Sequence, residues 1–355
     1  MSHEATYARV LEPAEMEPIT QLTGRLLDEM DRVLLGRTRL HRMVLVGILA
    51  RGHILLEGLP GVGKTAMIKA LGGLLSLQFR RVQFTPDLMP GDILGTHILQ
   101  QTDMGQREMV FQPGPVFTNI LLADEINRAS PKTQAALLEA MQERCVTLLG
   151  TTRKLDEPFF VLASQNPIEL EGTYPLPEAQ LDRFLLKLRV DDVDVETLEA
   201  IINTRRHGTP PASEWALSAD QLQSVFAAMD RVYLPRPVSR YISRLVAATH
   251  PRMPEATAAV NQYVSYGASP RGAIAIAEAA RAHALLEGRP TVGFADVRAV
   301  TTAVLNHRLI LSYKARFDGV DTYSVIEGLL GSLDEAELNL PADVQVSPAK
   351  PAARE

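Results

Sequence analysis

A stretch near residue 60 restricts the folds that this 355-residue chain can adopt. Residues 58–65 read Gly-Leu-Pro-Gly-Val-Gly-Lys-Thr and match the phosphate-binding pattern G-x-x-x-x-G-K-[ST] without a gap. A short apolar run over 53–56, typical of a buried parallel strand, precedes it, and apolar residues at helical spacing follow it. Strand, glycine-rich loop and helix in this order predict an α/β fold in which backbone N–H groups and a helix N-terminus surround a phosphate.

The residues of this loop predict individual contacts with a nucleotide. Gly61 and Gly63 let the backbone turn inward, Lys64 would reach the β- and γ-phosphates, and the Thr65 hydroxyl would hold Mg²⁺. A glycine-rich turn that merely opens a helix is the alternative, and the flanking strand and helix disfavour it. The other nucleotide-binding candidates are Pro60, Val62 and Ala66 at the loop, and Leu35 and Gly36 in an upstream turn. A base would rest against the backbone of that upstream turn, although a plain helix–turn–helix corner explains it equally well.

Two acidic residues, Asp124 and Glu125, follow the apolar run 120–123. They are expected at the carboxyl edge of a parallel sheet, where open α/β sheets bind ligands. Asp124 is placed to hold Mg²⁺ through its water shell, and Glu125 to orient and deprotonate an attacking water. A strand that ends in a solvated acidic turn is the alternative. The position of the pair, about sixty residues after a phosphate loop, favours the catalytic interpretation.

Three more polar residues are candidates because of where they stand relative to predicted strands and helices. Asn166 follows the apolar run 159–163, so its amide would lie near the γ-phosphate, although an Asn before Pro can also be a simple turn former. Arg183 precedes the final strand and is expected at the rim of the sheet, one strand beyond Asn166 along the same edge. From there it would reach a neighbouring subunit's nucleotide rather than its own. Arg271 opens a helix against the helix dipole, which favours a role in binding an external anion.

The order of predicted elements divides the chain into an arm, an α/β domain with two projecting hairpins, a small all-α lid and a tail. The expected bounds are 1–18 for the flexible arm, 19–207 for the nucleotide-binding domain, about 95–112 and 145–155 for the hairpins, 208–335 for the lid and 336–355 for a disordered tail.

The charge balance bears on the partners that the chain binds. A net charge of −6 and a pI near 5.8 argue against sequence-independent binding of nucleic acid, which depends on Lys and Arg neutralising phosphates. The single cysteine, Cys145, excludes an intrachain disulfide and fits a reducing compartment. Because the sequence shows neither a signal peptide nor an apolar run long enough to span a bilayer, we expect a soluble cytoplasmic protein without membrane insertion.

Together these residues resemble the AAA+ ATPases and, within them, the MoxR family. The resemblance covers about residues 20–332 and rests on a very specific set of motifs. Besides the phosphate loop, these are Leu-Leu-Ala-Asp-Glu-Ile-Asn-Arg-Ala at 121–129, Lys-Thr-Gln-Ala-Ala-Leu-Leu-Glu-Ala-Met-Gln-Glu at 132–143, Ala-Ser-Gln-Asn-Pro at 163–167, Pro-Glu-Ala-Gln-Leu-Asp-Arg-Phe at 177–184 and Gly-Ala-Ser-Pro-Arg at 267–271.

The resemblance implies a role for each candidate. The implied roles are Walker A for Lys64 and Thr65, Walker B for Asp124 and Glu125, sensor 1 for Asn166, arginine finger for Arg183 and sensor 2 for Arg271. It also implies hydrolysis of ATP with Mg²⁺, a homo-oligomer in the form of a hexameric ring with both hairpins facing a central pore, and chaperone-like remodelling or maturation of a protein client. The family is further associated with a partner protein that carries a von Willebrand factor A domain.

Three other functions remain open from the sequence alone. A metal-chelatase motor subunit shares the expected fold. A nucleic-acid motor shares both hairpins, but the acidic balance and the few basic residues there (Arg107, Arg153 and Lys154) disfavour it. A GTP switch is disfavoured because the sequence has no Asn/Thr-Lys-x-Asp motif for guanine.

Overall fold

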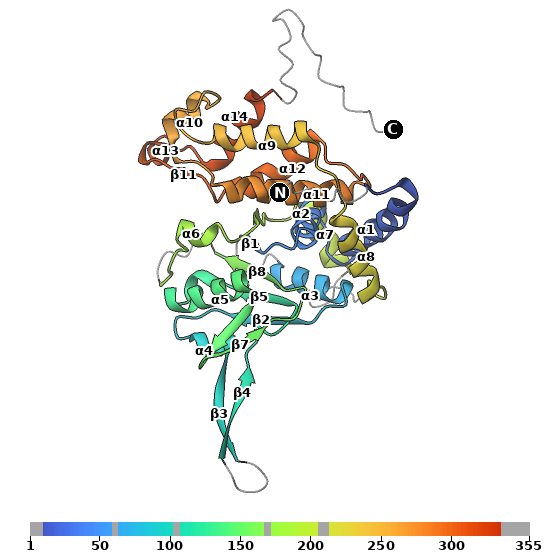
Figure 1. Cartoon of the computed structure of the whole chain (residues 1–355), viewed down its shortest axis with the longest axis vertical. Coiled ribbons are helices and arrows are strands. Elements are labelled where there is room, and N and C mark those ends of the chain that lie inside the picture. The colour runs from blue at the N-terminus through green and yellow to red at the C-terminus, as the bar shows by residue number, and fades with distance from the viewer. Residues whose placement is uncertain (1–9, 59–62, 102–106, 167–171, 205–212, 335–355) are drawn as a thin grey trace, which may run out of the picture.

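The computed structural model describes residues 10–58, 63–101, 107–166, 172–204 and 213–334. Figure 1 shows a layer of C-terminal helices above a central α/β layer, with a long hairpin projecting from the α/β layer on the side away from those helices. The predicted tail and the first nine residues lie outside the described residues.

Five parallel strands form the sheet at the centre of the α/β layer. Their order is β2-β5-β8-β1-β9, so the segments after β5, β8 and β1 leave the sheet at three adjacent positions on its carboxyl edge. The strands are β1 (Ile54–Glu57), β2 (Phe79–Gln83), β5 (Ile120–Asp124), β8 (Phe160–Gln165) and β9 (Leu186–Arg189).

Both faces of this sheet are buried, which explains why its inner strands read as continuous apolar runs. Ile120 and Leu122 of β5 pack in one hydrophobic cluster, whereas Leu121 and Ala123 pack in another, because alternate residues point to opposite faces. The surrounding helices are α1 (Pro13–Val33), α2 (Thr38–Leu49), α3 (Lys64–Leu74), α4 (Pro90–Leu94), α5 (Pro131–Glu143), α6 (Glu178–Leu181) and α7 (Val195–Thr204), with a 3-10 turn η1 (Ile126–Arg128). The predicted fold class is confirmed.

The first helix begins earlier than we expected. Residues 1–18 were predicted to be a flexible arm, but α1 starts at Pro13, and Met16 is buried. Pro13 occupies the first helical position, where a missing N–H costs nothing, and the backbone N–H of Glu12 donates to the Glu15 carboxylate at 2.9 Å. These local start signals and the buried apolar face extend the helix into the segment predicted to be an arm.

The C-terminal layer is helical, as predicted, with one addition. Its helices are α9 (Arg236–Ala248), α10 (Ala258–Tyr263), α11 (Pro270–Leu286), α12 (Phe294–Leu305), α13 (Tyr313–Phe317) and α14 (Thr322–Ser332). The preceding helix, α8 (Ala219–Met229), lies beside α1 (Figure 1). Two short strands, β10 (Val264–Tyr266) and β11 (Ile310–Leu311), pair antiparallel, so the lid is not all-α. Runs of two or three residues are too short to show a strand period in the sequence. None of the described helices is long and apolar enough to cross a membrane.

Both predicted hairpins are present. The longer one pairs β3 (Gly95–Gln101) with β4 (Arg107–Pro113), and the shorter one pairs β6 (Cys145–Leu148) with β7 (Thr151–Lys154). The guanidinium of Arg153 lies over the Phe111 ring, 3.9 Å from its centroid, so the two hairpins contact each other. The tip of the longer hairpin, residues 102–106, lies outside the described residues.

Candidate nucleotide site

A cavity of about 400 Å³ lies at the carboxyl edge of the sheet. Its walls come from the start of α3 and from the ends of β2, β5 and β8, and its volume is in the range of small-molecule sites. Its lining residues are Gly63, Lys64, Thr65, Ala66, Arg81, Gln83, Asp124, Glu125 and Asn166. The structure therefore brings the described end of the predicted loop, residues 63–66, together with the two acids and the asparagine around one space.

Lys64 is a cation that the fold buries inside this cavity. Only 8% of the residue is exposed, and its Nζ donates to the Gly58 carbonyl oxygen at 2.7 Å. Burial lowers the pKa of the Lys64 ammonium from its usual value, while the Asp124 and Glu125 carboxylates act in the opposite direction. Because a buried charge is costly without a counter-ion, an anion that enters the cavity would be stabilised here.

Asp124 ends β5 with a carboxylate that is nearly buried. Its Oδ1 accepts a hydrogen bond from Ser164 Oγ at 2.5 Å, and its Oδ2 accepts from the Nε and Nη2 atoms of Arg81 at 3.1 and 2.7 Å. The pairing of β2 with β5 sets Gln83 beside Asp124, so Arg81 lies two residues back on the same side of the edge strand. Both carboxylate oxygens thus have the partners that burial requires.

Glu125 follows in a strained backbone conformation, with φ of +56° in the left-handed region. Such conformations cost about 1–3 kcal/mol in a non-glycine residue and collect at functional sites. Its carboxylate accepts from Gln83 Nε2 at 2.7 Å and from Arg128 Nη1 at 3.1 Å, and its backbone N–H donates to Ser164 Oγ at 2.9 Å. To act as a base, this carboxylate must exchange one of its donors for a water molecule.

Asn166 lines the same cavity at the end of β8 and is 5% exposed. Its backbone carbonyl accepts from Asn127 Nδ2 at 3.4 Å. Since β8 lies between β5 and β1, Asn166 stands between the acidic pair and the phosphate loop. Asn166 thus lies at the carboxyl end of its strand, as expected, and its contact with a γ-phosphate stays a prediction.

The upstream turn with Leu35 and Gly36 precedes Arg37, whose side chain reaches toward Gly63. Gly36 has φ of +81°, and the Arg37 guanidinium comes within 3.9 Å of the point where a Cβ on Gly63 would stand. Contact of this turn with a base stays a prediction. The loop candidates Pro60, Gly61 and Val62 lie outside the described residues.

The donors at the cavity fit Mg²⁺. Mg²⁺ binds through oxygen ligands, usually one or two carboxylates plus phosphates and water. The hydroxyl-bearing Thr65 and the carboxylate of Asp124 line the same cavity, and a cation, the Arg81 guanidinium, already lies against Asp124 Oδ2. A metal at this oxygen would share the carboxylate with Arg81 or displace it.

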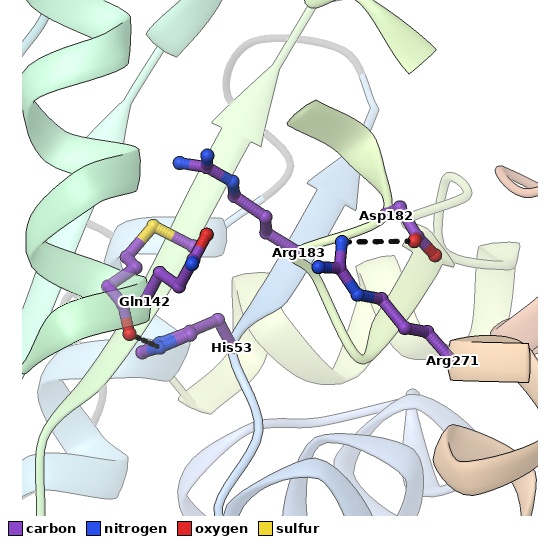
Figure 2. A pocket seen from close by; sticks show the side chains of 6 residues that line it. His53, Gln142, Asp182, Arg183 and Arg271 are labelled. Atoms are coloured by element: carbon purple, nitrogen blue, oxygen red, sulfur yellow. Dashed lines mark hydrogen bonds and ion pairs between the residues drawn. The ribbon is translucent and has the colours of Figure 1, made fainter. Parts of the chain in front are cut away.

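The two predicted arginines line a second pocket, of about 270 Å³, which is separate from the first. In this pocket (Figure 2), Arg183 comes from the segment before β9 and Arg271 from the first turn of α11. The guanidinium of Arg271 points toward Asp182. Arg271 Nη1 lies 3.6 Å from Asp182 Oδ2. His53 also lines this pocket (Figure 2), and its Nε2 lies 3.1 Å from the Met141 carbonyl oxygen. Burial of the imidazole lowers its pKa to about 4.

The position of Arg183 differs from our expectation in one respect. We expected it farther along the edge that carries Asn166, but residues that precede a parallel strand lie at the opposite, amino edge. The pocket of Arg183 contains His53, the residue just before β1, whereas Lys64 lies beyond the other end of β1. Four strand residues at about 3.3 Å each separate the two edges by about 13 Å. Arg183 and Lys64 of one chain therefore face different spaces.

Sequence reasoning missed Arg81 and Gln83, which line the first cavity, and Ser164, which contacts its two acidic residues. Ser164 is a buried polar residue at the end of an apolar strand, and it connects Asp124 with the backbone of Glu125. Arg81 and Gln83 alternate along β2, which places them on one face. The polar Ser164 in an apolar strand and the alternation of Arg81 with Gln83 are visible in the sequence. Only the register of β2 against β5 shows that Arg81 and Gln83 lie beside the acidic pair.

Comparison with known proteins agrees with this geometry. The model of the ATPase family associated with various cellular activities (AAA) matches residues 53–186, and that of the AAA lid domain matches residues 256–329. Chaperone MoxR1 of Mycobacterium tuberculosis is 42% identical over 342 residues, which cover 95% of this chain and 89% of the relative. The uncharacterized protein YeaC of Bacillus subtilis is 40% identical over 337 residues, 90% of this chain and 97% of the relative. The crystal structure of a candidate ATPase from Cytophaga hutchinsonii superposes with a TM-score of 0.82 at 39% identity and covers 90% of this chain and 97% of that one.

The family match spans the phosphate loop, the acidic pair, Asn166 and Arg183, and the lid match includes Arg271. On the combined weight of the cavity geometry and these similarities, this chain belongs to the MoxR family of AAA+ ATPases.

Proposed function

We propose that this chain hydrolyses Mg-ATP in a ring of six identical subunits and uses the energy to remodel or mature a protein client. The observation that carries the proposal is the convergence of Lys64, Asp124, Glu125 and Asn166 on one cavity of about 400 Å³. A buried cation faces a carboxylate pair across that space, which is the charge arrangement that phosphoryl transfer to water requires.

The residues of the cavity divide the work. Lys64 would bind the β- and γ-phosphates, and the Asn166 amide would lie beside the γ-phosphate, near the attacking water. Glu125 would accept the proton of that water. Mg²⁺, held by Thr65 and Asp124, would neutralise charge on the phosphate oxygens. Ser164 would keep the two acids in a fixed relation, because it bonds to both.

The outer side of the γ-phosphate would be completed by a second subunit. Arg183 and Arg271 share a pocket at the opposite edge of the sheet, so a head-to-tail neighbour would present both of them to this cavity. Head-to-tail contacts of this kind close into rings. We therefore assign both Arg183 and Arg271 to the neighbour's nucleotide.

Nucleotide and nucleic-acid assays test the enzymatic part. We expect the purified protein to release phosphate from ATP only with Mg²⁺, and to use GTP with a kcat/KM at least about tenfold lower. Double-stranded DNA is expected to leave the rate unchanged at fixed salt, because the acidic chain has few cations to neutralise its backbone.

Equal use of GTP would contradict the assignment to ATP. Stimulation by DNA that disappears at higher salt would favour the nucleic-acid motor instead. A metal-chelatase role would keep the ATP preference and would differ only in the partner that stimulates hydrolysis.

The long hairpin is the proposed client contact. Four of its apolar side chains are exposed: Ile98 (40%), Leu99 (57%), Met109 (57%) and Val110 (37%). Leu99 pairs with Met109 in this hairpin, so they form one apolar patch. MoxR1, a relative that aligns with 95% of this chain, is named a chaperone. A partner with a von Willebrand factor A domain remains part of the proposal through the family resemblance.

Substitution of this pair tests the client contact. We expect the double variant Leu99→Ser, Met109→Ser to keep ATP hydrolysis within about twofold but to bind an unfolded chain on the order of 10-fold more weakly, since two apolar side chains leave the interface. The readout is light scattering from citrate synthase as it unfolds on warming, with ATP present. The matched control replaces the neighbouring polar pair, Gln100→Ser with Glu108→Ser.

Loss of ATP hydrolysis in the Leu99, Met109 variant would show that the long hairpin belongs to the catalytic core. Equal suppression of aggregation by that variant and its control would remove the patch from client binding.

A further inference from the structure

Arg308 is a buried arginine that donates hydrogen bonds to the segment carrying Arg183. It follows α12, and its side chain is only 3% exposed. Its Nε donates to Asp182 Oδ1 at 2.8 Å, and its Nη2 donates to the Asp182 and Phe184 carbonyl oxygens at 3.3 and 2.7 Å. Its Nη1 donates to the Leu185 carbonyl oxygen at 3.2 Å. These acceptors lie on both sides of Arg183 in the chain.

Two neighbours of Arg308 strengthen this attachment. His307 Nε2 lies 3.0 Å from the Phe184 carbonyl oxygen, and Asn306 Nδ2 donates to the Lys187 carbonyl oxygen at 3.0 Å. Three consecutive lid residues thus hold the backbone from Asp182 into β9. The Arg183 side chain is left facing the second pocket (Figure 2).

Asp182 also connects Arg271, a second lid arginine, to the same segment. Besides Arg308, its carboxylate has Ser269 Oγ at 3.4 Å and Arg271 Nη1 at 3.6 Å. One carboxylate therefore faces two arginines, with Arg183 adjacent in sequence. This end of the pocket carries excess positive charge, as a site for a phosphate needs.

Lid attachment alone is a weak explanation for this arrangement. Burial lowers the pKa of the Arg308 guanidinium, with Asp182 acting in the opposite direction, so the charge is held at a cost. Buried ion pairs are often no more stabilising than apolar residues of similar size. The planar guanidinium does offer donors in a fixed fork, which sets the geometry of several backbone carbonyls at once.

We propose that Arg308 is a positioning residue that fixes the backbone of residues 182–185, so that Arg183 reaches the nucleotide of the neighbouring subunit. The proposal rests on the trans role given to Arg183 in the proposed function. Arg308 does not touch the nucleotide itself. It acts within its own subunit and serves the next subunit's site.

Mixing variants tests this assignment. Arg308→Lys keeps a cation near Asp182 but loses the fork, so we expect kcat to fall on the order of 10²-fold with a KM for ATP within about threefold. Mixed with Lys64→Ala protein, it should regain activity, because some interfaces pair its intact Lys64 with a correctly held Arg183 of the other protein. Mixed with Arg183→Ala protein, it should regain none, because every interface then lacks a working Arg183.

The control for general lid damage is Arg289→Met. Arg289 forms a bidentate pair with the fully buried Asp296 inside the lid, at 2.7 and 2.5 Å, away from the Arg183 segment. We expect Arg289→Met to lower Tm without the Arg308→Lys pattern of kcat loss and rescue. The pair Lys64→Ala with Arg183→Ala is the positive control, and its failure would count against the proposed function rather than against Arg308.

Two results would overturn the proposal while that positive control works. One is rescue of Arg308→Lys by Arg183→Ala protein, which would place its defect at its own nucleotide site. The other is an Arg308→Lys protein that fails to fold or to join rings with Lys64→Ala protein, which would assign Arg308 to lid stability alone.

Discussion

Glu125→Gln is expected to lower the kcat of ATP hydrolysis by on the order of 10²–10⁴-fold and to leave the Kd for ATP within about threefold. An amide cannot accept the proton of the attacking water, so the chemical step fails. Its oxygen can still accept from Gln83 and Arg128, which donate to the Glu125 carboxylate, so the shape of the cavity is kept. Phosphate release and binding of a fluorescent ATP analogue measure the two quantities separately.

Lys64→Ala should instead raise the Kd for ATP, because it removes the contact with the phosphates. Two charge-assisted hydrogen bonds to phosphates, at roughly 1.5–3 kcal/mol each, correspond to a Kd raised about 10²–10⁴-fold. Lys69→Ala is the matched control, because Lys69 lies on the same helix and is exposed. Glu327→Gln, an exposed carboxylate of α14, controls for the charge change at Glu125.

Hydrolysis by Glu125→Gln protein at near the wild-type rate would show that another group is the base. Weak ATP binding by the same variant would instead show that the Glu125 carboxylate helps to bind nucleotide. Either result would separate the roles given to the two acidic residues, since Asp124 keeps its Arg81 and Ser164 partners in this variant.

The sheet and the first cavity were predictable because their signals are local. The phosphate loop, the run before Asp124 and the run before Asn166 each combine an apolar strand with a polar end. Parallel strands bring such ends to one edge, so Lys64, Asp124 and Asn166 could be placed together without knowing the strand order.

The residues that sequence reasoning missed depend on contacts between distant segments. Arg81 meets Asp124 only through the register of β2 against β5, 43 positions apart. Arg308 meets Asp182 across 126 positions, from a lid whose docking no local pattern reveals. The same limit explains why Arg183 was expected at the wrong edge of the sheet. Its place just before the last strand was visible in the sequence, but its separation from the Lys64 cavity follows from the parallel pairing of β9 with β1 in the folded sheet.

Mixing Arg183→Ala with Lys64→Ala protein is expected to restore ATP hydrolysis that neither protein has alone. An arginine finger is worth on the order of 10³-fold or more in rate, so Arg183→Ala should be nearly inactive while it still binds ATP. In an equal mixture, about a quarter of the head-to-tail interfaces join an intact Lys64 to an intact Arg183, and the rate per interface should approach the wild-type value there.

The amino-edge position of Arg183 makes this test decisive. Within one subunit, the length of β1, about 13 Å, separates the Arg183 pocket from the Lys64 cavity. Swinging Arg183 across would also require breaking the hold of Arg308 on the Phe184 carbonyl. Co-assembly must be shown separately, by capture of one tagged variant with the other. If the two variants co-assemble and no activity returns, or if wild-type monomers hydrolyse ATP at the full rate, Arg183 does not act on a neighbour, and the second pocket must serve some other anion.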